Sequence, residues 1–294
     1  MAKYLDPKAD VTFKKVFGEH KNLLISLLNA LLPLDEGRRV ESIEYMTPEM
    51  VPDTPTRKDT SVDVRCEETG GRKFIVEMQM EWRASFKQRV LLNASKAYVR
   101  QLPKGDEYNL LQPVYSLNLV NEAFEPDQDE YYHYYRLVHY LHSDRVLEGL
   151  HLVFVELPKF KAGSLDEKKM QVLWLRFLTE IGESTEQAPQ DLIDDPHVNE
   201  ALEIVEESAY SDAERYEYER FWDYASREAT KEADMKTAVA QRDAAVARAD
   251  AEKARADAAT ETLRQTVFNL KAMGLSIEQI VAATGLTAAE INAL

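Results

Sequence analysis

The chain has 294 residues, 45% of them hydrophobic, and a formal net charge of −16 at pH 7. This length suggests about two domains. No stretch reaches the roughly 18 consecutive apolar residues of a membrane span, so we expect no membrane association. The first residues contain no apolar signal region, and a single cysteine, Cys66, excludes an internal disulfide. A cytoplasmic protein is therefore expected.

The negative charge is unevenly distributed along the chain. Residues 1–120 carry 18 Lys and Arg against 17 Asp and Glu, residues 121–235 carry 11 against 28, and residues 236–294 carry 7 against 7. The acidic stretch 183–235 is typical of a solvated face, which we favour, although such a stretch can also mimic DNA and shield a site. The two neutral ends could approach phosphates, with an affinity that is modest and sensitive to salt.

Periodicity predicts a mixed α/β order in the first part of the chain. Apolar residues at three-four spacing over 11–32 predict two helices separated at Gly18. The alternating segments 61–66 and 73–80, with Gly70 and Gly71 between them, predict a β-hairpin. The remaining predicted elements are strands at 40–45, 113–120, 131–137 and 150–156, and helices at 86–102 and 165–181.

The C-terminal part predicts one long helix and a small helical tail. Residues 235–273 are rich in alanine and contain no Pro or Gly, and Asp243, Asp250 and Asp257 repeat every seven residues. This pattern fits a weak coiled-coil seam, with a homo-oligomer and preferably a dimer as its consequence, or a solvated spacer helix.

The tail resembles a helix-turn-helix because Ser276 and Thr287 are N-cap candidates and Glu290 completes a capping box. Its second helix has no Lys or Arg, which argues against base readout and leaves a cap or oligomerisation role open.

The candidate chemistry lies on the hairpin. Strand alternation places Ile75, Glu77 and Gln79 on one face. The same reasoning places Val62, Val64 and Cys66 towards the core, and Asp63 and Arg65 away from it. Asp63, Glu77 and Gln79 could then share a face, where two carboxylates suit Mg²⁺ and the amide could hold an attacking water. The alternative is a set of ordinary surface acids, because the spacing alone is not specific.

The wider sequence resembles the recombination-promoting nuclease (Rpn) family of transposase-like proteins, within the PD-(D/E)XK nuclease superfamily. The similarity covers about residues 6–180, and its motifs are weak singly and specific together. They are Asp10 to Gly18, Leu27 to Leu32, Asp63, Glu77-Met78-Gln79, Phe86 with Arg89, Tyr98, Leu102 with Gly105 and Tyr108, Pro113-Val114, Phe154 to Phe160, and Trp174.

This resemblance implies a restriction-endonuclease-like α/β fold, a mixed sheet flanked by helices, followed by the long helix and the small cap. It also implies metal-dependent DNA cleavage with Mg²⁺ or Mn²⁺, DNA as a partner, and a role in recombination, transposition or phage defence. Asp63 and Glu77 match the metal ligands, Gln79 matches a position that is usually lysine, and Asp10 matches an acidic residue on the first helix.

Gln79 departs from the superfamily pattern because an amide carries no positive charge. Lys58, Lys73 or Arg89 could supply that charge, although Arg89 could equally form a salt bridge to a core carboxylate. Without such a substitute, the protein would be a catalytically weak or inactive nuclease fold that binds DNA or assembles. We expect four regions: a nuclease-like domain at 1–182, an acidic connector at 183–234, a long helix at 235–272 and the tail at 273–294.

Overall fold

The computed structural model describes residues 3–50, 60–80, 83, 85–102, 105, 107–162 and 169–293. The chain divides into two compact units, Met1–Ala225 and Ser226–Leu294, which are considered one at a time. Within the described ranges, no helix is both long enough and apolar enough to cross a bilayer.

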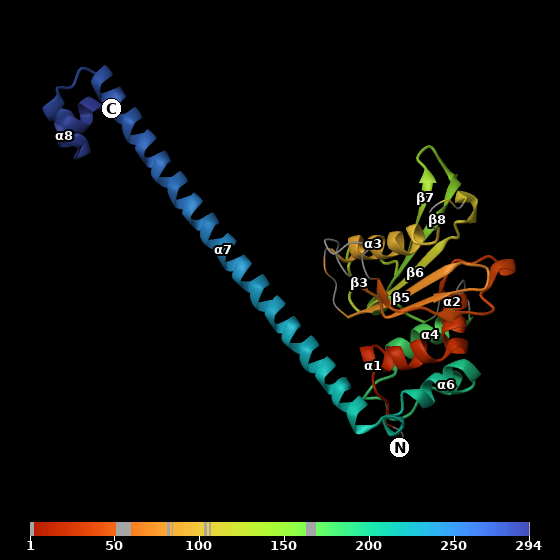
Figure 1. Ribbon diagram of the computed structural model, residues 1–294. Coiled ribbons are helices and arrows are strands. Elements are labelled where there is room, and N and C mark those ends of the chain that lie inside the picture. The colour runs from red at the N-terminus through yellow and green to blue at the C-terminus, as the bar shows by residue number, and fades with distance from the viewer. Residues whose placement is uncertain are drawn as a thin grey trace. The chain divides into compact units, whose positions relative to one another are not determined.

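A six-stranded mixed sheet lies at the centre of the first unit (Figure 1). Strands β5, β6 and β8 run parallel, whereas the other neighbours pair antiparallel. Gln79, Val120 and Glu156 therefore mark one edge of the sheet, where the three parallel strands end. The order is β1 (Glu44–Tyr45), β4 (Val64–Glu67), β5 (Lys73–Gln79), β6 (Val114–Val120), β8 (His142–Glu156) and β7 (Tyr132–His139), and a separate pair joins β2 (Glu49–Met50) to β3 (Thr60–Ser61).

Helices cover both faces of this sheet (Figure 1). The main core joins one face to α1 (Asp10–Phe13), a π-helical segment (Lys14–Gly18), α2 (Lys21–Leu31), α4 (Lys169–Glu180) and α6 (Pro196–Ile204). Aromatic rings anchor it, with the centroid of Phe17 5.4 Å from that of Trp174. Only α3 (Phe86–Val99) packs on the other face among the described helices, through Val90, Ala94 and Ala97.

Short helical elements complete the first unit. They are α5 (Gln190–Ile193) and 3-10 turns at Glu36–Arg38, Tyr108–Leu110, Leu157–Lys159 and Glu207–Ala209. The predicted α/β class with a mixed sheet, flanking helices and a long C-terminal helix is confirmed.

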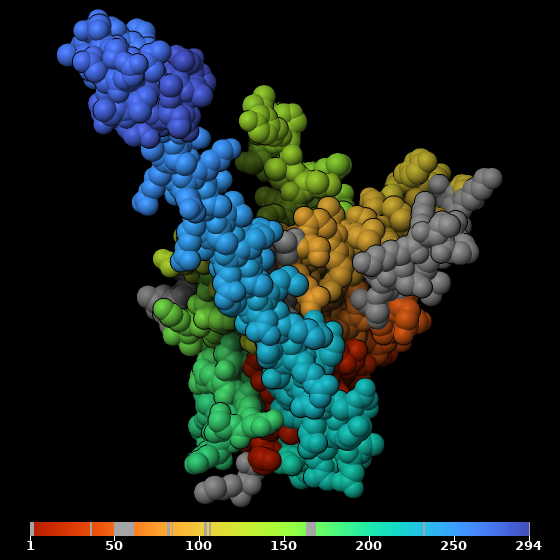
Figure 2. Space-filling view, turned by 90° about the vertical axis from the view of Figure 1, so that its left-hand side faces the viewer, coloured from red at the N-terminus to blue at the C-terminus, as the bar shows by residue number. Residues whose placement is uncertain are grey.

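Two strands differ from the sequence prediction. The strand expected at 40–45 is only the two residues of β1, because just Glu44 and Tyr45 pair with β4. By contrast, β8 begins at His142, eight residues earlier than expected. Its first half is largely exposed and pairs with β7 in a ribbon that projects from the sheet (Figures 1 and 2). A strand exposed on both faces has no hydrophobic alternation, so periodicity could not reveal it.

The second unit consists of a long helix and its cap. Helix α7 (Asp212–Ala272) enters this unit at Ser226, and α8 (Ile277–Thr284) and α9 (Ala288–Ala293) pack against its end (Figures 1 and 2). The predicted capping residues hold both short helices: Ser276 accepts from Gln279 N, and Thr287 exchanges hydrogen bonds with Glu290. Val267, Ile280 and Ile291 form the buried centre of this cap.

Candidate functional site

The β4–β5 hairpin brings Asp63 and Glu77 together. Val64 pairs with Val76 in this antiparallel ladder, so the residues next to that pair, Asp63 and Glu77, are neighbours across the strands. The Met78 N–H donates a hydrogen bond of 2.6 Å to Asp63 Oδ2, which fixes the aspartate at the start of β4. Gly71, with φ +85°, makes the turn that connects the two strands.

One prediction about this hairpin is wrong. Val62 was expected to share a face with Val64 and Cys66, but it packs with Ile75 and Ala94 under α3, whereas Val64 and Cys66 lie in the main core. The reason is a bend at Asp63 that interrupts the alternation before β4 begins.

Glu77 is buried, with 4% of its surface exposed, and its carboxylate points towards α3. Asn93 Nδ2 donates to Glu77 Oε1 at 3.0 Å, and the Arg89 guanidinium donates to Glu77 Oε2 at 3.2 Å. Sequence reasoning missed Asn93. It lies four residues after Arg89, so the predicted helix already placed both side chains on one face and offered a signal that could have found it.

Gln79 belongs to the same network. Its Oε1 accepts a hydrogen bond of 2.5 Å from Arg89, so one guanidinium links Glu77 to Gln79. The guanidinium carbon also lies 4.8 Å from the centre of the Phe86 ring, which helps to hold the arginine over the sheet. A positive charge therefore lies beside Gln79, the position that the resemblance matches to a lysine.

Burial dominates the electrostatics of the two carboxylates. It raises the pKa of Asp63 to about 6, helped by the charges of Glu77 and Asp10 and opposed by the Met78 N–H and by Lys14. Burial also raises the pKa of Glu77, although Arg89 and Asn93 counteract it. Burial thus disfavours the ionised form of both acids, and a nearby positive charge favours it.

The supporting residues named from the sequence differ in whether the structure brings them to the carboxylate pair. Asp10 forms an ion pair of 2.7 Å with Lys14, and its effect on the pKa of Asp63 places it near the carboxylate pair. Lys73 lies at the opposite end of β5, where it forms an ion pair of 2.5 Å with Glu67, so it is not brought to the site. Lys58 lies outside the described residues.

The oxygen atoms around Glu77 fit a hard divalent cation. Asp63 and Glu77 offer carboxylates, Gln79 offers an amide oxygen, and Asn93 Oδ1 is buried without a hydrogen-bond partner in the described part of the chain. Within that part, no group of three or more His, Cys, Asp and Glu side chains is placed to hold a metal. Two carboxylates are nevertheless sufficient for Mg²⁺, which keeps several of its waters.

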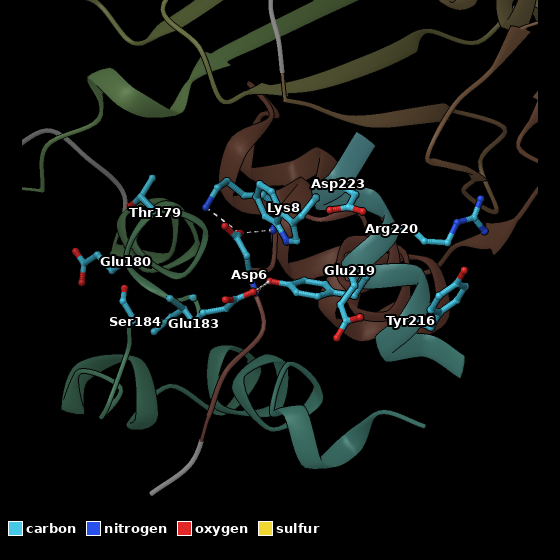
Figure 3. A pocket seen from close by; sticks show the side chains of 14 residues that line it. Asp6, Lys8, Thr179, Glu180, Glu183, Ser184, Tyr216, Glu219, Arg220 and Asp223 are labelled. Carbon is cyan, nitrogen blue, oxygen red and sulfur yellow. Dashed lines mark hydrogen bonds and ion pairs between the residues drawn. The ribbon is translucent and has the colours of Figure 1, made fainter. Parts of the chain in front are cut away.

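A cavity of about 900 Å³ lies elsewhere in the first unit, and none of these site residues lines it (Figure 3). Its walls come from the N-terminal segment, the turn after α4 and the beginning of α7. Tyr218 crosses it, donating a hydrogen bond to Glu183 and accepting one from the Asp6 N–H, each 2.9 Å long. These contacts tie the N-terminal segment to α7.

Comparison with known proteins identifies the family. No curated protein and no solved structure matches the chain. The model of a family described as "PD-(D/E)XK nuclease family transposase" matches residues 7–239, which include the hairpin, α3 and the whole six-stranded sheet. The resemblance seen in the sequence is thereby confirmed, and the chain belongs to the PD-(D/E)XK nuclease family transposases.

Proposed function

We propose that this protein is a metal-dependent DNA endonuclease that hydrolyses phosphodiester bonds. The observation that carries the proposal is the buried pair Asp63 and Glu77, held by Met78 N, Asn93 and Arg89 in a chain of a nuclease family. Asp63 and Glu77 would hold Mg²⁺ or Mn²⁺. When bound, such an ion would stabilise the charge that develops on the scissile phosphate.

Three side chains of the protein would orient the metal-binding carboxylate, orient the attacking water and supply positive charge. Asn93 fixes one oxygen of Glu77 and so orients its carboxylate. The Gln79 amide, which can both donate and accept, would orient the attacking water. Arg89 would supply the positive charge that glutamine lacks, because its guanidinium already contacts Gln79 Oε1 and keeps its charge at any physiological pH.

Plasmid cleavage tests this proposal. The purified protein should nick or cut supercoiled DNA with Mg²⁺ or Mn²⁺ and not with EDTA. Asp63→Asn should abolish cleavage, whereas Asp129→Asn, an equal charge change at an exposed loop position, should leave it unchanged. Equal cleavage by wild type and Asp63→Asn would reject the assignment.

A second candidate is a catalytically weak or inactive nuclease fold that binds DNA or assembles. It is favoured by Gln79 and by the Arg89 guanidinium, which already contacts Glu77 where a cation would bind. Calorimetric titration with Mn²⁺ separates the two candidates. Binding that is lost in Asp63→Asn supports the enzyme, and no binding by wild type supports the scaffold.

The biological role and the assembly are part of the proposal. A nuclease of a transposase family would act in recombination, transposition or phage defence. We also propose a homodimer through α7, because Met235, Val239 and Val246 are exposed on that helix at positions of one heptad seam.

A further inference from the structure

Positive charge gathers on the helix that covers Glu77. Residues 86–100, the helix and its C-cap, contain four Lys and Arg and no Asp or Glu, in a chain whose net charge is −16. With about 100° per residue, Arg89, Asn93, Lys96 and Arg100 fall within an arc of about 60° on this helix. Since Arg89 and Asn93 contact Glu77, this stripe runs along the flank of α3 that borders the hairpin.

Arg65 faces this stripe from the sheet. It pairs with Ile75 in the β4–β5 ladder, and Ile75 packs under α3, so Arg65 projects towards the α3 face. It follows Asp63 by two residues, which corresponds to about 7 Å along a strand. Arg65 is half-buried, and its Nε is buried without a hydrogen-bond partner among the described residues.

Two opposite charges act on the Arg65 guanidinium among the described residues. Arg100 is close enough for its charge to act on the Arg65 guanidinium. Glu67 is the acid that opposes this effect, but it already forms an ion pair of 2.5 Å with Lys73. Two neighbouring guanidinium groups, one with an unsatisfied buried N–H, form a place that an anion would stabilise.

We propose that Arg65 and Arg100 form a subsite for a phosphodiester group of the DNA backbone, next to the group that is cleaved. This inference rests on the proposed nuclease function, because it takes the Asp63–Glu77 pair as the cleavage position. A nucleic-acid strand carries regularly spaced anions, so a strand with one phosphate at Glu77 would continue along the α3 stripe to Arg65 and Arg100. The guanidinium fork suits the phosphate oxygens and reads no base.

DNA binding without cleavage tests the subsite. Fluorescence anisotropy with a labelled duplex and a labelled single strand, in EDTA, gives the binding constant over a series of salt concentrations. Arg65→Gln and Arg100→Gln should each reduce the slope of log K against log salt by about 0.9 for the duplex and about 0.7 for the single strand. The double variant should lose about twice as much, while Arg65→Lys should keep most of the slope because it keeps the charge.

The matched control is Arg220→Gln, which removes an exposed arginine of α7 that pairs with Glu217. It should leave the slope unchanged. Arg65→Gln and Arg100→Gln variants that fold, as judged by thermal melting, and bind with the wild-type slope would overturn the inference.

Cleavage of plasmid DNA with Mg²⁺, measured in parallel, separates this inference from the proposed function. Wild-type cleavage together with unchanged binding by the variants refutes the subsite alone. Binding that depends on Arg65 and Arg100 without any cleavage supports the subsite and refutes the enzyme. A wild-type protein that binds no DNA refutes both.

Discussion

The buried surroundings of Asp63 disfavour its ionised carboxylate, and this makes the stability of the fold depend on pH. Its pKa in the fold is about 6, above the value near 3.9 expected when unfolded. The stability that its protonated form contributes is fully present below pH 4 and is lost as the pH rises to 6. Two pKa units correspond to about 2–3 kcal/mol.

Asp63→Asn should therefore stabilise the metal-free protein by about 2 kcal/mol at pH 7.5 and hardly at all at pH 4. The amide oxygen can still accept the Met78 N–H, so the hairpin contact is kept. Urea unfolding followed by tryptophan fluorescence measures this, because all tryptophans of the chain lie in the first unit. The same difference between wild type and variant at both pH values would contradict the prediction.

The role of Arg89 can be separated from that of a simple salt bridge. If its charge replaces the missing lysine, Arg89→Ala should lower the single-turnover cleavage rate by about 10²–10³-fold, the typical effect of losing one stabilising donor. Stability should also fall, because Arg89 is the cation that counteracts the burial of Glu77, so the rate is compared under conditions where the variant is folded. Gln79→Lys added to Arg89→Ala should restore part of the rate.

The opposite result would also be informative. A rate that rises in Arg89→Ala would show that the guanidinium competes with the cation at Glu77. Arg83→Ala, which removes an exposed arginine just before α3, controls for the general loss of positive charge.

Single residues show how far sequence reasoning reaches. Asp63, Glu77 and Gln79 were predictable because they lie on one hairpin, whose alternation and Gly-Gly turn are local signals. Helix and strand spacing placed Asn93 beside Arg89 and Arg65 on the face of Asp63, but their roles were not predicted, because these depend on how α3 docks on the sheet. The bend at Asp63 was also hidden, since a strand pattern cannot show where the ladder starts.

At the scale of elements, the hairpin turn positions the candidate site. Gly71 has φ +85°, and a Cβ there would lie 3.0 Å from Gln112 Cγ. Gly71→Ala should destabilise the first unit by about 1–2 kcal/mol, because an L side chain is strained at positive φ and Gln112 would have to shift. Urea unfolding measures the change.

The neighbouring glycine provides the control. A Cβ at Gly70 would meet only Glu68 Oε2 at 3.8 Å, and its φ is not in the left-handed region. Gly70→Ala should therefore change the free energy of unfolding by less than about 0.5 kcal/mol. Equal effects of the two substitutions would show that the turn conformation does not matter.

Some helices and strands could be predicted from the sequence, and others could not. Helices α2, α3 and α4 each bury one stripe of apolar residues, and 3.6-residue periodicity detects such stripes. The projecting half of β8 escaped because its residues are exposed on both faces. The capped helices of the tail were predictable from single residues, because Ser276 and Thr287 form their hydrogen bonds within three residues.

At the scale of the whole molecule, positive and negative charges are concentrated in different segments of the chain. The net charge of −16 argues against DNA binding, yet α3, which contacts Glu77, carries Lys and Arg and no Asp or Glu. Average composition therefore misleads here, while the local distribution agrees with the proposed substrate. The same separation predicts a modest DNA affinity with a shallow salt dependence, because a small positive surface neutralises few phosphates and because salt also screens the repulsion of the acidic segment 183–235.

Assembly is the last property that the sequence leaves open. Val239 and Val246 are 43% and 54% exposed on α7, an unusual position for β-branched apolar residues, and they occupy one heptad position. Arg242 and Lys253 interrupt the same seam, so a dimer formed through it should be weak and dependent on concentration. Light scattering after size-exclusion chromatography should show a dimer for the full chain at high concentration.

Two double variants distinguish a seam from a solvated spacer. Val239→Asp with Val246→Asp places charges in the seam and should give a monomer over the whole concentration range. Ala244→Asp with Ala251→Asp places the same charges on the opposite side of the helix and should leave the dimer intact. Both pairs keep the seven-residue spacing, and Ala→Asp lowers helix propensity more than Val→Asp does, so loss of the dimer only in the valine pair reports on the apolar contact and not on helix stability. A full chain that is monomeric, or equal masses for the two variants, would show that α7 is a spacer.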